Sequence, residues 1–166
     1  FFSFSFSGFP SPARGALFDH DYQVFDGILR EIVKLDGPRS TVHYWRVKEK
    51  RKTVESLAVD FSSVSKTDYD QWTRELRLSF LINAFNFFTL RAIAARYPIQ
   101  SVESIDHPKA VQLFGLEMTL GQLIDRYLKK EFAGPSQDLR WIFAISCGAK
   151  GCPSLMNQAY RATELE

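Results

Sequence analysis

One stretch, Arg74 to Pro98, constrains the fold of this chain more than any other. It contains no Gly or Pro before Pro98, which cannot continue a helix. Apolar residues recur in it at the spacing of a helix face, at Leu76, Phe80, Phe87, Leu90 and Ala94. The other faces are apolar as well, and a helix that is apolar all round is a buried helix. The stretch therefore predicts a long core helix.

Two asparagines interrupt the apolar surface of this predicted helix. Asn83 and Asn86 are three residues apart, so their side chains lie on nearly one face. A buried amide without partners costs about 1–3 kcal/mol. We therefore expect both amides to be hydrogen-bonded, either to the backbone of other segments or at the wall of a ligand pocket.

The composition favours one globular domain and excludes some partners. The 166 residues are 45% hydrophobic and 14% aromatic, which is enough for a single packed core. The net charge is only +2, and no basic stripe alternates with aromatic residues, so nucleic acid is not an expected partner. The basic cluster Lys48 to Lys52 is predicted to be a solvated helix face or turn. No apolar run approaches the roughly 18–20 residues of a transmembrane helix.

Shorter patterns predict the remaining elements. Residues 1–16 alternate Phe with Ser and then carry Pro and Gly, so we expect an extended, poorly ordered lead before a domain over residues 17–166. Helices are predicted over Phe18–Lys34 with Asp21 as N-cap, over Lys50–Phe61, and from Thr119, which has capping-box spacing with Gln122, to about Phe132.

Extended structure is predicted in three places. Ser40–Val47 is rich in β-branched and aromatic residues, and Val111–Met118 has the pattern of a hairpin around Gly115. Leu139–Ser146 is a compact apolar run that is typical of a central buried strand, and Ser154–Glu166 has a weak helical pattern. The expected fold class is α+β, a mostly helical single domain around a long buried helix and a small β-sheet.

The two cysteines flank a glycine-rich loop after the predicted strand. Cys147 at a strand end is well placed for a nucleophile, because backbone N–H groups of the loop can form an anion nest and Lys150 favours a thiolate. The same spacing also permits a disulfide between Cys147 and Cys152 in an oxidising compartment, or a pair of inert buried thiols. These three alternatives stay open.

Histidines are scarce, and each has a structural alternative. A cysteine nucleophile needs an imidazole to take its proton, and His20, beside Asp19, is the candidate base. His20 at a helix start can equally cap or pack, and His43 can be a half-buried strand residue or a binding residue. No motif spacing brings together the three or four ligands that a metal needs, so neither a metal nor another cofactor is expected.

Five segments, in order, resemble the DUF547 family, a domain named for its unknown function. They are FDHDYQVFDGILREIV, VHYWRV, RLSFLINAFN, YPIQSV and ISCGAKGCPSLMNQAY, and together they span about Phe18 to Glu166. The resemblance implies an exported (periplasmic or extracellular) protein, because many bacterial members look exported. Some animal members join this domain to glutaredoxin, which implies a connection with thiols or glutathione.

The chain departs from the family pattern at several polar positions. The family usually has a Glu-His pair where this chain has Ile124 and Asp125, a His where it has Ile142, and an acid where it has His43. If the polar cluster of the family is catalytic, this member has lost part of it. The resemblance therefore implies a binding domain with impaired catalysis.

Three functions follow. The first is binding of a small polar or peptide-like ligand, thiol-bearing or similar to glutathione, in a cleft framed by His20, His43, Asn83, Asn86 and the loop with Cys147, Lys150 and Cys152. The second is a cysteine-dependent hydrolase or transferase that uses Cys147 as nucleophile with His20 or His43 as base. The third is a structural or protein-interaction domain in which a loop disulfide only stabilises the fold.

Overall fold

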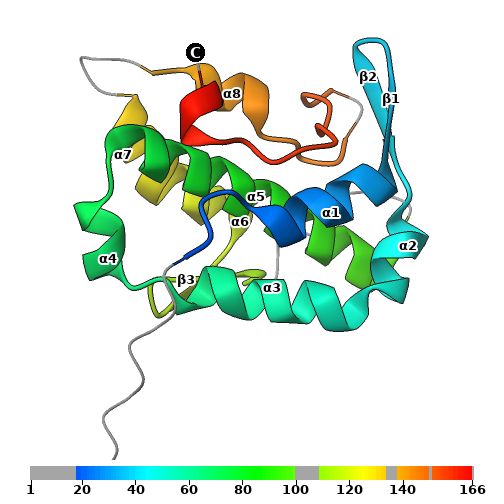
Figure 1. Cartoon of the computed structure of the whole chain (residues 1–166), viewed down its shortest axis with the longest axis horizontal. Coiled ribbons are helices and arrows are strands. Elements are labelled where there is room, and N and C mark those ends of the chain that lie inside the picture. The colour runs from blue at the N-terminus through cyan, green and yellow to red at the C-terminus, as the bar shows by residue number, and fades with distance from the viewer. Residues whose placement is uncertain (1–17, 100–108, 134–137, 150, 166) are drawn as a thin grey trace, which may run out of the picture.

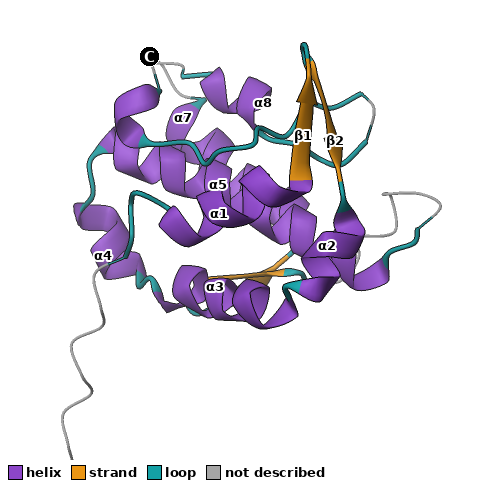
Figure 2. Ribbon diagram, turned by 45° about the vertical axis from the view of Figure 1, so that its right-hand side comes forward, coloured by secondary structure: helices purple, strands orange, loops and turns teal. Residues whose placement is uncertain are grey.

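The computed structural model describes residues 18–99, 109–133, 138–149 and 151–165. Helices dominate it, and the strands form two separate antiparallel hairpins (Figures 1 and 2). The first half of the chain contains α1 (Gln23–Ile32), β1 (Val33–Asp36), β2 (Arg39–Val42), α2 (Tyr44–Glu49), α3 (Arg51–Ser63), α4 (Lys66–Gln71) and α5 (Arg74–Arg96). The second half contains β3 (Val111–Leu113), β4 (Leu116–Met118), α6 (Leu120–Leu123), the π-helical segment η2 (Ile124–Lys129), α7 (Lys130–Phe132), α8 (Arg140–Ala144) and the short 3-10 helix η3 (Ala162–Glu164).

Helix α5 is the predicted core helix. It begins after Thr73, whose hydroxyl accepts the N–H of Leu76 (3.3 Å), and it ends at Arg96, just before Pro98. Every residue from Leu78 to Leu90 is buried. In Figure 1 it runs through the middle of the molecule, with α3 on one side and α8 on the other, and it contacts α2, α3, α6, η2, α8 and η3. The mostly helical α+β domain built around a long buried helix is confirmed.

Phenylalanine rings make up much of the core on the α3 side of α5. Phe61 of α3 stacks on Phe87 with ring centroids 5.1 Å apart, and Phe25 of α1 meets Phe87 edge-on at 5.7 Å. Phe80 and Phe88 also contact Phe61. The Phe cluster of α5 is therefore packed inside the protein, where aromatic pairs add to the stabilisation from area burial.

Among the described residues, α5 is the one helix long and apolar enough to cross a membrane by length and composition. Most of its apolar window is buried inside the protein, as in the core helix of a globular domain. The buried asparagines Asn83 and Asn86 face protein groups rather than lipid.

The prediction of a buried strand over Leu139–Ser146 is wrong, and α8 occupies its place. Trp141 and Ala144, three residues apart, are buried, whereas Ile142 and Phe143 are exposed, which is one apolar face of a helix. A short apolar run does not distinguish the two structures by periodicity alone. The small sheet expected around this run is accordingly absent from the described residues, where the strands form only the β1–β2 and β3–β4 hairpins.

The weak helical pattern over Ser154–Glu166 is also a wrong prediction apart from η3. The N–H groups of Ala159 and Tyr160 donate to side chains of α1 and α5, so they are not available to a helical ladder. Ser40–Val47 is extended only through β2, because α2 begins at Tyr44. In both places, the partners that decided the conformation come from other parts of the chain.

Several local predictions are confirmed. The hairpin turns at Gly115, which has φ +73°, and Thr119 and Gln122 form the predicted capping box. Val54, Leu57 and Ala58 of α3 are buried as expected. The start of α1 differs: Asp19, rather than Asp21, accepts N–H groups, those of Asp21 and Gln23 at 2.9 Å each.

The segment between α3 and α5 also contains a helix, α4, that the sequence patterns did not predict. The hydroxyl of Ser65 accepts the N–H of Asp68 and begins α4. The predicted lead, residues 1–16, lies outside the described residues. Buried side chains from α1 through the C-terminal segment form one cluster. Residues well before α5 therefore belong to the same core.

Candidate functional site

Asn86 fixes the chain at the end of α8. Its amide donates to the carbonyl of Ala144 (3.0 Å), and its Oδ1 accepts the N–H of Ser146 (2.8 Å). Both hydrogen-bonding ends of the side chain are thus occupied by one short stretch of backbone just before Cys147. The amide that was a candidate ligand-binding group holds the segment that leads into the cysteine loop.

Asn83 makes the same kind of double contact with the C-terminal segment. Its amide donates to the carbonyl of Tyr160 (2.7 Å), and its Oδ1 accepts the N–H of Tyr160 (2.9 Å). Asn83 is fully buried and Asn86 is nearly so. The two amides therefore satisfy buried backbone groups on both sides of the cysteine loop, which meets the expectation that they are hydrogen-bonded to other segments.

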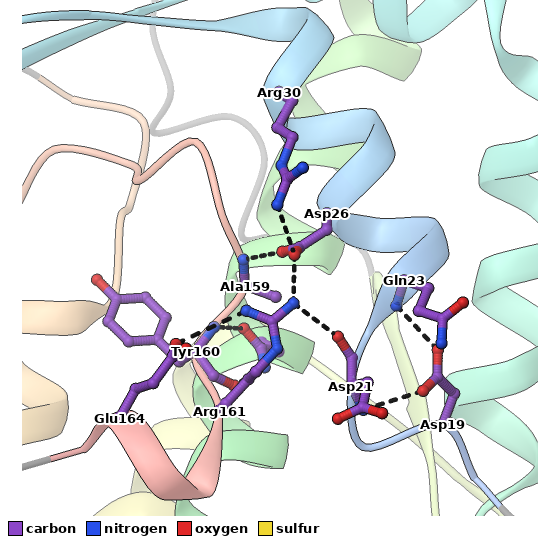
Figure 3. Close-up of polar contacts among 10 residues, drawn as sticks. Asp19, Asp21, Gln23, Asp26, Arg30, Ala159, Tyr160, Arg161 and Glu164 are labelled. Carbon is purple, nitrogen blue, oxygen red and sulfur yellow. Dashed lines mark hydrogen bonds and ion pairs between the residues drawn. The ribbon is translucent and has the colours of Figure 1, made fainter.

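A buried carboxylate completes the attachment of the C-terminal segment. Asp26 of α1 accepts the N–H of Ala159 and a hydrogen bond from the guanidinium of Arg161, and it also faces Arg30 at 3.6 Å. Figure 3 shows Arg161 lying between Asp26 and the backbone carbonyl of Asp21. The carboxylate of Asp26 raises the pKa of the Arg161 guanidinium.

Cys147 and Cys152 pair as a disulfide, with Cα atoms 5.7 Å apart. Lys150, the residue expected to favour a thiolate, lies outside the described residues. A disulfide sulfur carries no thiolate, so the proposed nucleophile would require reduction first. Among the described residues no hydrogen bond joins His20 or His43 to either cysteine.

The two described candidate histidines lie in structural surroundings. The ring of His20 packs edge-on against Trp72 (4.4 Å between centroids) and Phe18 (5.3 Å), and its buried Nδ1 has no hydrogen-bond partner. His43 precedes α2, and its N–H donates to the carbonyl of Ile32 (2.8 Å), which continues the β1–β2 pairing. Within the described parts of the chain, no group of His, Cys, Asp and Glu side chains converges to hold a metal ion.

Burial lowers the pKa of His20 below its usual 6.5, and the carboxylates of Asp19 and Asp21 offset part of this effect. The unfolded chain therefore binds more protons than the folded one as the pH falls below about 6.5, and stability present above that pH is lost. We expect His20→Gln to remove this pH-dependent loss of stability. Urea unfolding at about pH 7.5 and at about pH 5 measures the free energy of unfolding for both proteins. A wild-type protein that loses no more stability than His20→Gln over this range would contradict the prediction.

A cavity of about 670 Å³ lies between α2, α3 and the C-terminal half of α5. Small apolar side chains line part of it: Val47, Val54, Ala92, Ala94, Ala95 and Ala110. Its rim carries four cations and one carboxylate, Lys48, Arg51, Arg91, Arg96 and Glu55. We call this the basic cavity; Asn83, Asn86 and the cysteines are not among its lining residues.

The cations of the basic cavity differ in how they are used. Lys48 donates to the carbonyl of Tyr97 (2.9 Å), and Arg91 donates to both carboxylate oxygens of Glu55 (2.7 and 3.3 Å). Arg51 and Arg96 have no hydrogen bond or ion pair to any described residue. Two guanidinium groups that line this cavity thus lack a partner within the described part of the chain.

Helix stability does not explain the position of Arg51. It is the first residue of α3, whose first turn contains no acidic residue. A helix N-terminus carries a partial positive charge, so a cation there is unfavourable for the helix. Lys48 and Arg96 do complement the negative end of α5, but Arg51 adds to the positive potential instead. An anionic ligand would balance this arrangement.

A match to a family model shows which protein family this chain belongs to. A model described as "Protein of unknown function, DUF547" matches residues 69–166. The chain belongs to the DUF547 family. The DUF547 match begins inside α4 and includes Asn83, Asn86 and the cysteine loop, whereas α1 to α3 precede it. No curated protein and no solved structure matches the chain.

The basic cavity was missed in the sequence because its cations come from separate segments. Lys48 and Arg51 belong to the Lys48–Lys52 cluster, which was interpreted as a solvated face or turn, and it does bridge α2 and α3. Arg91 and Arg96 lie five residues apart near the end of α5. The sequence did show two basic clusters, each next to small apolar residues. No local pattern shows that these two clusters face each other in the fold.

Proposed function

We propose that this DUF547 domain binds a small anionic molecule in the basic cavity. The proposal depends on the guanidiniums of Arg51 and Arg96, which have no partner among the described residues and line a cavity with small apolar side chains. The cavity volume of about 670 Å³ is within the range of small-molecule sites, about 300–1,000 Å³. Arginine suits this task because its planar fork matches carboxylate and phosphate oxygens in pairs.

The expected function is still binding of a small polar ligand, but its site lies in the basic cavity rather than beside Asn83, Asn86 and the cysteine loop. A small polar ligand remains the expected partner, but the amides of Asn83 and Asn86 are occupied by backbone groups. Glutathione, which carries two carboxylates, is one candidate among other anions. We also propose that the domain works in an oxidising compartment, where the disulfide persists; free thiols in the protein as isolated would contradict this.

The double variant Arg51→Ala with Arg96→Ala is expected to weaken binding of an anion at least about tenfold, equivalent to about 1.4 kcal/mol. Isothermal titration calorimetry with glutarate, inorganic phosphate and glutathione measures this effect. Affinity for the wild-type protein is expected to fall as salt is added, because exposed charges are screened.

A matched control removes two cations away from the basic cavity. Lys52 neighbours Arg51 on α3, and Arg126 lies on η2; both are exposed and neither lines the cavity. The pair Lys52→Ala with Arg126→Ala changes the net charge by the same amount, and anion affinity is expected to stay within about twofold. Equal weakening in both double variants would show general attraction to a basic protein, and no binding of any of the three anions would refute the proposal.

A further inference from the structure

A second cavity continues from the basic cavity along α3. It measures about 320 Å³ and is lined by Ala58, Val59, Ser62, Ser63 and Gln112, together with Glu55 and Arg91. Glu55 and Arg91 line both cavities. Their ion pair therefore lies where the two cavities adjoin, and we refer to the adjoining cavities between α3, α5 and β3 as the groove.

The two ends of the groove offer opposite hydrogen-bonding chemistry. The hydroxyl of Ser62 lies within hydrogen-bond distance of the carbonyls of Ala58 (2.6 Å) and Gln112 (2.9 Å), which compete for its one hydrogen. The hydroxyl of Ser63 donates to the carbonyl of Asp60 (2.8 Å). The amide nitrogen of Gln112 donates to Glu117 (3.3 Å). The second amide hydrogen of Gln112 stays available, and the hydroxyl oxygens together with Oε1 of Gln112 add acceptors to the second cavity.

The groove is thus polarised along its length. Arg51 and Arg96 lie at one end, the acceptor oxygens of Ser63 and Gln112 lie at the other, and the Glu55–Arg91 ion pair lies between them. A ligand that matches both ends carries an anionic group at one end and a hydrogen-bond donor, such as an ammonium group, at the other. Ala58 and Val59 give the Ser63 end of the groove an apolar wall.

The length of the groove limits the size of this ligand. Arg51 and Ser63 are the first and last residues of α3, which has 13 residues. At about 1.5 Å per residue, they are about 18 Å apart along the helix axis. An extended peptide of four residues spans about 13–14 Å, whereas a dipeptide spans about 7 Å. A tetrapeptide covers most of that length, whereas a dipeptide covers less than half of it.

We propose that the groove binds a short extended peptide with a free amino group and an acidic C-terminal residue, an inference that rests on the anion site proposed above. The carboxylates of the C-terminal residue lie with Arg51 and Arg96. The N-terminal ammonium group lies with Ser63 and Gln112, and the chain passes the Glu55–Arg91 pair. The second cavity would thus select ligands by their length and by the charge of their amino end.

Calorimetry with four probes tests the proposal: glutarate, the dipeptide Ala-Glu, the tetrapeptide Ala-Ala-Ala-Glu and its N-acetylated form. The free tetrapeptide is expected to bind at least about fivefold more tightly than the dipeptide or the N-acetylated form. Gln112→Leu and, separately, Ser63→Ala are expected to reduce this advantage at least about threefold and to leave glutarate binding unchanged. Arg51→Ala is expected to weaken all four probes.

The outcomes separate this inference from the function on which it rests. If glutarate and all three peptides bind with equal affinity and Arg51→Ala weakens them alike, the anion site stands and the peptide groove is overturned. If none of the four probes binds, both proposals fail. Thermal unfolding of each variant, with a midpoint close to that of the wild type, shows that a lost advantage reflects binding rather than folding.

Discussion

Asn86→Ala is expected to lower the free energy of unfolding by about 2–4 kcal/mol. The substitution leaves the carbonyl of Ala144 and the N–H of Ser146 without their partner. A buried polar group that loses its hydrogen bond costs about 1–3 kcal/mol, and water can reach the half-buried Ser146 in part. Urea unfolding followed by circular dichroism at neutral pH measures the change.

The control for this experiment is Asn157→Ala. Asn157 is half-buried in the same C-terminal region, and no described residue hydrogen-bonds to its side chain, so a change within about 0.5 kcal/mol is expected. Folded Asn86→Ala protein is also expected to bind glutarate as the wild type does. A variant that keeps its stability and loses anion binding would reverse this interpretation and return Asn86 to the ligand site.

Asp26→Ala is expected to cost about 3 kcal/mol, because it breaks a buried ion pair. Removing one partner of such a pair typically costs about 3–5 kcal/mol, since the other charge stays behind without compensation. Asp26 is 5% exposed, and its loss also frees the N–H of Ala159. Arg161 keeps the carbonyl of Asp21 and an ion pair with Glu164 (3.6 Å), which places the cost at the lower end.

A double-mutant cycle distinguishes the ion pair from simple loss of packing. Asp26→Ala and Arg161→Ala together are expected to cost less than the sum of the single variants, with a coupling of about 1–3 kcal/mol. Arg30→Ala is the control, because the Arg30 side chain is 68% exposed and contacts Asp26 only at 3.6 Å; it is expected to cost less than about 1 kcal/mol. Additive single effects would show that Asp26 and Arg161 do not stabilise the fold as a pair.

These two experiments probe the same structural principle. The chain from Ala144 onward has little regular structure among its described residues, and side chains of α1 and α5 bind its backbone directly. Backbone groups that a helix or sheet would normally satisfy are satisfied here by Asn83, Asn86 and Asp26. Asn83, Asn86 and Asp26 therefore have structural partners in the fold.

The sequence alone predicted the features that depend on near neighbours. The long helix followed from its unbroken apolar surface and from Pro98, the β3–β4 hairpin from Gly115, and the start of α6 from Thr119 and Gln122. It also predicted that Asn83 and Asn86 must have partners, because an unpaired buried amide is costly wherever it lies. Each of these inferences needs only residues within a turn or two.

The tertiary structure alone decided which groups those partners are and where a cavity forms. Leu139–Ser146 is too short for its period to separate a helix from a strand, so its packing against α5 determined α8. Tyr160 is 77 residues from Asn83, and Ala159 is 133 residues from Asp26. The basic cavity exists because α2 and α3 bring Lys48 and Arg51 to the end of α5, and no local pattern records which distant surfaces meet when the chain folds.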